Sequence, residues 1–191
     1  MVSNKNYMGV FLSSDGGSTW TQVRIRSDVD SLAQVAAMDP SNTRTIYVAG
    51  VTFSGSPVLH KSTDGGANWT SLSPPSTQAR IDALAVSNGS PAMVYTATWE
   101  GVFSSADGGG SWTKLANPPY SSSCLAVNKL NPNELFVGSW DGLWYSCDKG
   151  ATWTDLTADL PVKTVNSIQV DGAARKVYVG TEGGGICRRS F

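Results

Sequence analysis

Two short segments of the sequence combine an aromatic residue, an acid and a glycine: Trp99-Glu100-Gly101 and Trp140-Asp141-Gly142. A third, Thr181-Glu182-Gly183, keeps the acid without the aromatic ring. A tryptophan face can stack on a sugar ring, and a neighbouring carboxylate accepts hydrogen bonds from the sugar's hydroxyl groups. Alternatively, the tryptophans pack between structural repeats and the acids are solvated turn residues. The sequence leaves both interpretations open.

Arginines in two polar connections offer a second kind of chemistry, because a guanidinium group can clamp a carboxylate or a phosphate. The simpler interpretation is that these arginines are solvated. With the aromatic and acidic residues above they complete our set of candidate ligand-binding residues: Trp99, Glu100, Trp140, Asp141, Glu182, Arg24, Arg26 and Arg80.

Other catalytic or metal chemistry has little support in the sequence. His60 is the only histidine, which removes a His-rich metal cluster and disfavours a Ser-His-Asp triad. Cys124, Cys147 and Cys187 are odd in number and lack a Cys-x-x-Cys spacing, so neither a disulfide framework nor a zinc site is indicated. We therefore assign no catalytic residue, metal ligand or cofactor.

Composition excludes further classes of function. The chain has 14 basic and 15 acidic residues and a formal net charge of −1, which provides no basic footprint for nucleic acid. No window approaches the roughly 20 apolar residues of a membrane helix, and the first residues lack the apolar core of a signal peptide. We expect a soluble protein that binds neither nucleic acid nor membranes, and its location stays unknown.

An internal repeat positions the candidate residues. The pattern Ser-x-Asp-x-Gly-x-x-Trp occurs four times at intervals of 41 to 49 residues: Ser13–Trp20, Ser62–Trp69, Ser105–Trp112 and Ser146–Trp153. We call these segments the four Asp turns. Four strands of five or six residues with their turns need about 40 residues, so the period fits one four-stranded blade of a propeller.

The segments between the Asp turns also repeat, as four short strands that we label a to d. The a strands are predicted at Leu32–Met38, Ile81–Val86, Cys124–Val127 and Val165–Val170, and the b strands at 45–50, 93–98, 135–139 and 176–181. The c strands lead into the Asp turns, and the d strands follow each tryptophan. The total is seventeen strands: two at the N-terminus (c and d), three complete sets of a to d, and three at the C-terminus (a, b and c).

Each Asp turn has a local explanation as a hairpin between strands c and d. The aspartate accepts hydrogen bonds from backbone N–H groups two residues on, and the glycines supply positive φ values. The tryptophan then returns to the sheet and buries apolar surface. We therefore expect a structural and not a catalytic role for Asp15, Trp20, Asp64, Trp69, Asp107, Trp112, Asp148 and Trp153.

The four Asp turns resemble the Asp box, or BNR repeat, of sialidases, xyloglucanase-type glycosidases, sortilin-like receptors and photosystem II assembly factors. This resemblance implies an all-β propeller of four-stranded antiparallel blades, with the boxes at its periphery opposite the ligand face. The ligand face would then comprise the b–c and d–a connections. Sialidases also have an Arg-Ile-Pro motif before the first box, whereas the nearest string here, Arg24-Ile25-Arg26, follows it and lacks the proline.

The length of the chain raises the question of how such a ring closes. We expect residues 1–191 to form a single propeller domain of about four blades, with three complete blades and one composite blade built from both termini. One c strand is then surplus, because both termini supply one. A closed monomeric ring, a homodimer that completes a larger eight-bladed ring, and a fragment of a longer chain all remain open.

Three functions are compatible with this arrangement. The first is a non-catalytic binding or scaffold module for a protein partner, by resemblance to the assembly factors and receptors. The second is a lectin-like carbohydrate-binding protein. The third is a glycoside hydrolase or a piece of one, which requires two carboxylates about 5–5.5 Å or 6.5–9.5 Å apart. Glu100, Asp141 and Glu182 are the acids that the repeat places on one face.

Overall fold

Short strands make up almost all of the regular structure. The computed structural model describes residues 8–25 and 31–191, and within them it contains seventeen strands and one three-residue 3-10 helix, Thr157–Asp159. This confirms the predicted all-β class and the number of strands. The candidate residue Arg26 lies outside the described residues.

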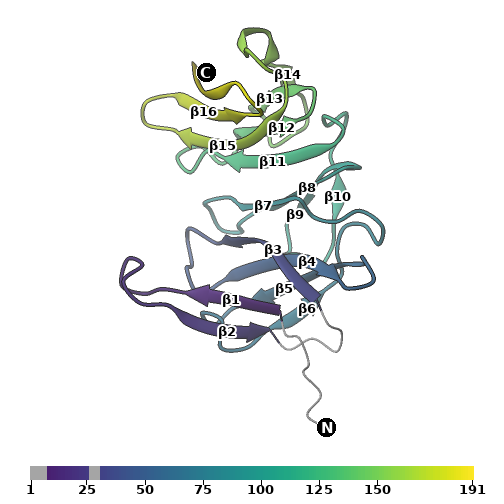
Figure 1. The fold of residues 1–191 in the computed structure, drawn as a ribbon, viewed down its shortest axis with the longest axis vertical. Helices are drawn as coiled ribbons and strands as arrows, with labels where there is room; N and C mark the ends of the chain where they lie inside the picture. Colours follow the sequence, from purple (N-terminus) through teal and green to yellow (C-terminus); the bar gives the residue numbers. More distant parts are fainter. Residues whose placement is uncertain (1–7, 26–30) are drawn as a thin grey trace.

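In this part of the chain five antiparallel sheets follow one another in sequence order (Figure 1). The N-terminal hairpin consists of β1 (Met8–Leu12) and β2 (Thr21–Ile25). The first blade contains β3 (Ser31–Met38), β4 (Ile46–Thr52), β5 (Pro57–Ser62) and β6 (Thr70–Leu72). The second contains β7 (Ala83–Val86), β8 (Val94–Thr98), β9 (Gly101–Ser105) and β10 (Thr113–Lys114).

The third blade contains β11 (Ser122–Val127), β12 (Leu135–Ser139), β13 (Gly142–Ser146) and β14 (Thr154–Asp155). The C-terminal sheet contains β15 (Val165–Asp171), β16 (Lys176–Thr181) and β17 (Gly185–Ser190). In every sheet, hydrogen-bonded neighbours are consecutive in sequence, so each blade is a simple meander in the predicted order a to d. The chain is thus a β-propeller arrangement of about four blades.

The apolar core lies between the blades. Tyr47 and Leu59 of the first blade pack with Leu84 of the second, and Phe136 and Leu143 of the third blade pack with residues of the C-terminal sheet. Because each blade has a neighbour on both faces, the central strands are buried along their whole length instead of alternating between buried and exposed residues. The repeat therefore encodes one blade interface several times.

Each Asp turn is held by the same hydrogen bonds. The serine Oγ accepts the N–H of the glycine four residues later at 2.7–2.8 Å. The aspartate Oδ1 accepts the N–H of the residue four positions on, at 2.9 Å, and Oδ2 accepts a side-chain donor of that residue at 2.6–2.7 Å. The prediction that the aspartate accepts the N–H two residues on is therefore wrong. The two residues after each aspartate have positive φ values, and they fold the turn back so that a later N–H reaches the carboxylate.

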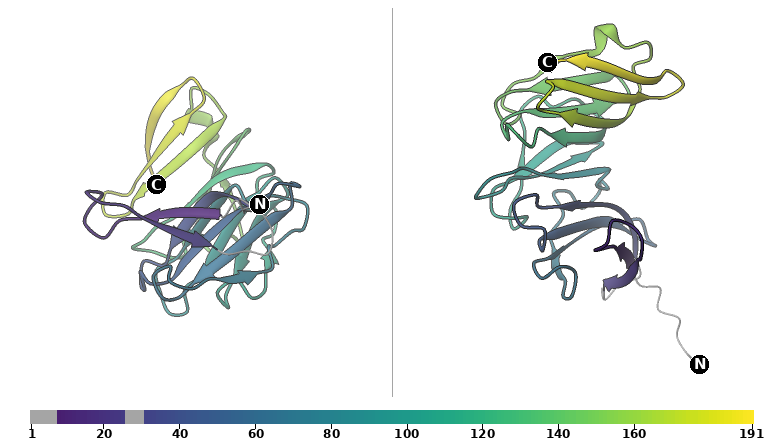
Figure 2. Two further views of the ribbon diagram at one scale, coloured as in Figure 1. Left: turned by 60° about the horizontal axis from the view of Figure 1, so that its bottom comes forward. Right: turned by 90° about the vertical axis from the view of Figure 1, so that its left-hand side faces the viewer.

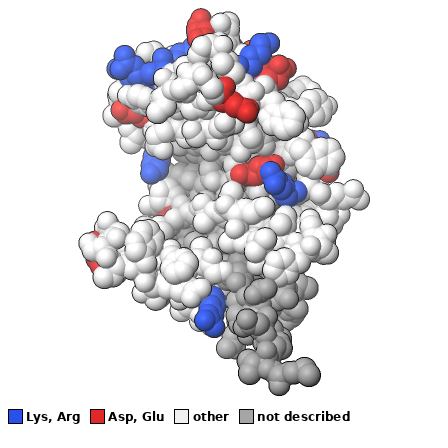
Figure 3. All heavy atoms as spheres, viewed as in Figure 1, with Lys and Arg blue, Asp and Glu red and all other residues white. Residues whose placement is uncertain are grey.

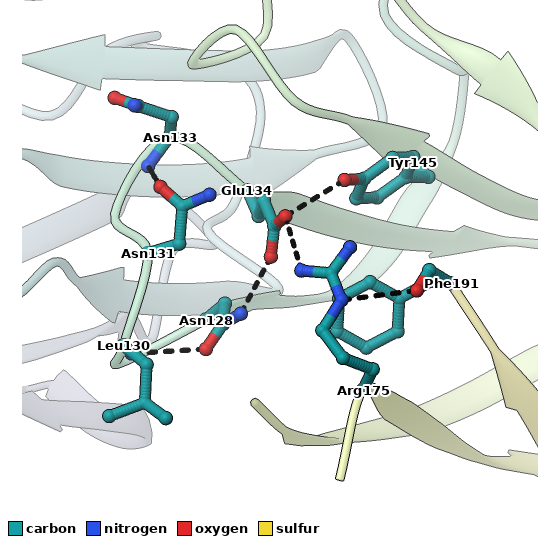
Figure 4. A network of polar contacts seen from close by, with 8 residues as sticks. All are labelled: Asn128, Leu130, Asn131, Asn133, Glu134, Tyr145, Arg175 and Phe191. Carbon is teal, nitrogen blue, oxygen red and sulfur yellow. Dashed lines mark hydrogen bonds and ion pairs between the residues drawn. The ribbon is translucent and has the colours of Figure 1, made fainter. Parts of the chain in front are cut away.

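A buried polar network joins the third blade to the C-terminal sheet (Figure 4). Glu134 accepts hydrogen bonds from Asn128 Nδ2 at 2.6 Å and Tyr145 Oη at 3.1 Å, and forms an ion pair with Arg175 Nη1 at 2.6 Å. Burial raises the pKa of Glu134, but these three donors outweigh burial and lower the pKa overall. Arg175 also donates to the Phe191 carbonyl at 3.2 Å and lies over its ring.

The two terminal sheets lie at opposite ends of the molecule (Figures 1 and 2). Among the described residues, the N-terminal hairpin and the C-terminal sheet are separate sheets, so no described sheet combines strands from both termini as the expected composite blade would. The physical reason is that β1 and β17 are both c strands, and a four-stranded blade has one position for a c strand. Strand β17 already pairs with β16 over six residues, and β1 stays paired with β2. The blades form an open arc.

Among residues 8–25 and 31–191, no helix has the length and apolar character needed to cross a membrane.

Candidate functional site

The b–c turns and the d–a connections open onto the same end of the blades. Trp99 lies in the turn between β8 and β9, and Trp140 in the equivalent turn between β12 and β13. The Asp turns join strands c and d and therefore lie at the opposite end, because successive antiparallel strands reverse direction. This separation places the candidate tryptophans away from the structural turns.

A cavity of about 740 Å³ opens between the second and third blades and reaches the first. It brings together three of the predicted ligand residues, Trp99, Trp140 and Arg80. The remaining lining residues come from the same connections, from the starts of the a strands and from the end of β4: Gln34, Val51, Gly55, Gln78, Asp82, Ser121, Ser122 and Ser123. Its volume is within the range of small-ligand sites.

The two tryptophans present large apolar surfaces to this cavity while their backbones are fixed. Trp99 is 55% exposed and Trp140 is 73% exposed. The Trp99 carbonyl accepts the N–H of Ser121 at 3.1 Å, and the Trp140 carbonyl accepts Thr164 Oγ1 at 3.4 Å. Exposed aromatic rings on a backbone held in this way lose little conformational freedom when a ligand binds.

Gly142 shapes the turn that carries Trp140. Its φ is +148°, and a Cβ at this position would lie 1.8 Å from Thr157 Oγ1. Any side chain would therefore collide with the 3-10 helix that follows β14. The Trp-Asp-Gly order of this turn has a steric reason, which the sequence pattern alone did not provide.

The charged part of the cavity is an ion pair. Arg80 Nε lies 2.5 Å from Asp82 Oδ1, and the arginine side chain is more exposed than the aspartate. Part of the arginine's capacity to bind an anion is therefore already satisfied within the chain. The other polar groups of the lining are amides and hydroxyls, so the cavity favours a neutral hydrogen-bonding ligand over an anion.

The three acids singled out by the repeat do not line this cavity. Glu100 Oε1 accepts a hydrogen bond from Ser76 Oγ at 3.2 Å, and Asp141 lies 3.9 Å from Lys163 Nζ with both side chains exposed. Glu182 is exposed in the equivalent turn of the C-terminal sheet. Of the described residues that line the cavity, Asp82 is the one carboxylate.

Arg24 is also distant from the tryptophan pair. It lines a smaller cavity of about 330 Å³ with Ala67, Asn68 and Trp69, beside the second Asp turn. This places Arg24 with the structural turns and not with Arg80. The structure therefore places Arg24 and Arg80 at different cavities.

Sequence reasoning missed the neutral polar lining. Gln34 and Ser123 lie at β-bulges near the starts of β3 and β11, and β15 has a bulge at the same place. A bulge redirects side chains locally. Serines and glutamines carry no distinctive spacing, so the shared position at the start of each a strand was the available signal.

Within the described ranges, no group of three or more histidine, cysteine or acidic side chains is arranged to hold a metal ion. Figure 3 shows one face of the molecule, on which charges of both signs are scattered over a largely uncharged surface. The chemistry of the candidate site thus depends on tryptophan faces, amides, hydroxyls and one ion pair.

Comparison with known families gives one sequence match. A family model described as the DUF6242 beta propeller domain matches residues 40–184, which include the cavity residues from Val51 to Trp140. No curated protein matches the chain in sequence.

Solved structures extend the comparison to the fold. The GH74 enzyme of Niastella koreensis is 18% identical, with a TM-score of 0.70 over 82% of this chain and 28% of its own. The GH74 xyloglucanase from Xanthomonas campestris is 17% identical, with a TM-score of 0.70 over 92% of this chain and 31% of its own. YCF48 bound to D1 peptide is 16% identical, with a TM-score of 0.60 over 83% of this chain and 51% of its own.

These structures share the propeller fold with the chain, at identities too low to show a common activity. The chain spans less than a third of the length of either GH74 enzyme and about half of YCF48.

Proposed function

The chain belongs to the family of DUF6242 beta propeller domains, and from this premise we propose that it is a non-catalytic binding module whose ligand face is the cavity beside Trp99 and Trp140. The proposal rests on one observation. Two exposed tryptophans from neighbouring blades flank a polar cavity on the face opposite the Asp turns. Exposed tryptophans beside a concave site are typical anchors of binding surfaces.

A protein partner is the first candidate ligand. YCF48, which shares the fold, has been solved with a D1 peptide. In this chain the two indole rings would anchor apolar side chains, and the serine and glutamine side chains would bond to the backbone of an extended segment. The ion pair of Arg80 and Asp82 would contribute to orientation and little to affinity, because it is already satisfied.

A glycan is the second candidate, and the neutral lining favours it. Amide and hydroxyl groups from Gln34, Gln78 and Ser121–Ser123 suit the alternating donors and acceptors of sugar hydroxyls. The two tryptophan faces would stack on sugar rings. This function uses the same cavity, so the two candidates differ in the ligand and not in the site.

Hydrolysis of a glycan has weaker support. A glycosidase needs two carboxylates facing one bond, whereas one carboxylate lines the described cavity and is paired with Arg80. Glu100 and Asp141 would have to turn toward the cavity to take part. The geometry therefore favours binding over turnover.

The test compares the wild-type protein with the double variant Trp99→Ala, Trp140→Ala. A phage library of random twelve-residue peptides is selected on the wild type with counter-selection on the double variant, and both proteins are applied to a glycan array. We expect binders from one of the two sources that lose at least tenfold in affinity on the double variant, in line with the loss of two anchors.

The matched control is Phe53→Ala. Phe53 is exposed in the equivalent turn of the first blade but does not line the cavity, so its removal should leave affinity unchanged. Peptides or glycans that bind the double variant as well as the wild type would place the ligand face elsewhere. Turnover of aryl glycosides by the wild type would contradict the non-catalytic assignment.

A further inference from the structure

The two ends of the arc expose surfaces that are buried everywhere else in the repeat. We propose that a second copy of this chain covers them, with the N-terminal hairpin of one copy packed face to face on the C-terminal sheet of the other. Two such contacts close a dimeric ring. This inference is independent of the ligand proposed above, because it concerns the ends of the arc and not the cavity.

The exposed surface of the hairpin lies on the side away from the first blade. Val10 and Leu12 pack toward the first blade, so alternation along β1 directs Phe11 to the opposite face. Phe11 is 59% exposed, whereas His60 and Phe103, which hold the same position in β5 and β9, are 2% and 7% exposed. In those strands the preceding unit covers the position.

Trp20 shows the same difference between the first Asp turn and the others. It is 62% exposed, while Trp69 and Trp112 pack within the cores that join their blades to the preceding unit. The second glycine of each later turn also rests against a leucine of that unit, namely Leu12, Leu72 or Leu115. At Gly17 a Cβ would meet Trp20 of its own turn and no leucine. The first turn lacks its preceding unit.

The C-terminal sheet lacks its following unit. Val179 packs toward the third blade, and its cross-strand partner is Cys187, so the neighbouring Ile186 points to the outer face. Ile186 is 82% exposed. Its equivalents in the three complete blades are at most 1% exposed: Leu59, Val102 and Leu143.

Polar groups at the two ends are also complementary. In the first blade, the cross-strand pair Tyr47 and Lys61 donates from Tyr47 Oη and Lys61 Nζ to the Gly108 carbonyl of the next Asp turn, each at 3.2 Å. The C-terminal sheet repeats this pair as Tyr178 and Arg188, which are also cross-strand partners. Gly16 holds in the first Asp turn the position of Gly108.

The second copy would therefore supply the missing acceptor. Within the described residues, the side chains of Tyr178 and Arg188 have no hydrogen-bond partner, and the Gly16 carbonyl of another copy offers the same kind of acceptor that Gly108 offers inside the chain. We name Phe11, Gly16 and Trp20 the N-terminal face, and Tyr178, Ile186 and Arg188 the C-terminal face. The proposed contact reproduces the interface between the first and second blades.

A single contact of this kind is small. Each sheet face measures about 14 by 18 Å, so the four faces of two contacts come to about 1,000 Å² in projection, close to the lower limit for stable association. A contact between two different faces either closes into a ring or continues as a filament. When two copies close into a ring, both contacts form together.

Light scattering after gel filtration tests the proposal with two variants, each of which damages one face. The wild type should have twice the mass of one chain. Phe11→Asp and Ile186→Asp should each be monomeric, because each buries a charge against the opposite face. In an equimolar mixture, the intact C-terminal face of the first variant meets the intact N-terminal face of the second in one of the two contacts, so the mixture should associate more strongly than either variant alone and less strongly than the wild type.

The control is Leu130→Asp, which changes an exposed leucine outside both faces and should stay dimeric. A milder double variant, Tyr178→Phe with Arg188→Ala, guards against loss of fold and should weaken the dimer at least tenfold through two lost hydrogen bonds per contact. A monomeric wild type, a dimeric Phe11→Asp variant, or a mixture that associates no more strongly than either variant alone, although both variants show native circular dichroism, would each overturn the proposal.

Discussion

At the scale of single residues, the Asp turns owe their rigidity to carboxylates with saturated hydrogen bonding. Asp15 accepts bonds from the side chain and the backbone of Thr19 and from Ser13, and these donors lower its pKa to about 2. Bonds from Thr152 and Ser146 lower the pKa of Asp148 to about 2 in the same way. The negative charge is therefore part of the turn, although it has no catalytic task.

Acid should weaken the fold through these carboxylates. Their folded pKa values lie below the ordinary value of 3.8, so they contribute stability above about pH 4, and this contribution is lost as the pH falls toward 2. Urea denaturation at pH 5 and pH 2.5 should show this loss, and Asp148→Asn should reduce the difference between the two pH values. Asp141→Asn, in an exposed turn, is the control and should leave the difference unchanged.

The Glu134 network makes a second prediction for a single side chain. Glu134→Gln removes the ion pair with Arg175 and weakens the bonds with Asn128 and Tyr145. We expect a loss of about 1–3 kcal/mol in the free energy of unfolding, below the value for a fully buried pair because Arg175 is half exposed. Urea denaturation at pH 7 measures it. Glu182→Gln, on an exposed turn, should change stability by less than about 0.5 kcal/mol.

At the scale of elements, the repeat predicted the strands well because residue type and turn position indicate the same strand boundaries in each repeat. Four of the five c strands lead into a serine that starts an Asp turn, and each a strand is an apolar run between polar turns. The cavity was predicted only in part. Trp99, Trp140 and Arg80 stand out by residue type, whereas Gln34 and Ser123 lie at bulges beside the cavity that residue type does not reveal.

The equivalent b–c turns should differ sharply in their tolerance of a side chain. Gly142→Ala should destabilise the protein by more than about 2 kcal/mol, because its Cβ would overlap Thr157 and the backbone is in the left-handed region. Gly185 has the equivalent position, because it pairs with Thr181 as Gly142 pairs with Ser139. Its φ is +75°, but no atom lies within 4 Å of an added Cβ, so Gly185→Ala should cost about 1 kcal/mol. Thermal unfolding of both variants checks the contrast, and equal losses would refute the steric explanation.

At the scale of the whole molecule, stability is distributed over the interfaces between successive blades. Cores join the hairpin to the first blade, the first blade to the second, and the third blade to the C-terminal sheet. Closure could not be predicted from the sequence, since β1 and β17 are equally good c strands and the pattern does not decide between them. In the structure each of them pairs with its neighbour in sequence, β1 with β2 and β17 with β16.

Cys124 can report the opening of one such interface. It lies between the third blade and the C-terminal sheet, where Sγ donates to the Val165 carbonyl at 3.7 Å, and burial raises its pKa to about 11. In a Cys147→Ser, Cys187→Ser background, labelling of Cys124 with a thiol reagent should be slow and limited by opening. Phe191→Ala removes a ring packed on Phe136 and should accelerate labelling at least tenfold. Equal rates would show that Phe191 does not hold this interface closed.

The shared register of the blade interfaces has a genetic consequence. A crossover between the DNA segments that encode two Asp turns would add or remove one whole blade. At the new junction, the face that one blade packs on its following blade would meet the face that another blade packs on its preceding blade, as at the existing interfaces. Such an event changes the length of the arc without creating an unfamiliar surface in the middle of the chain. The number of blades can therefore vary between descendants far more readily than the residues that join one blade to the next.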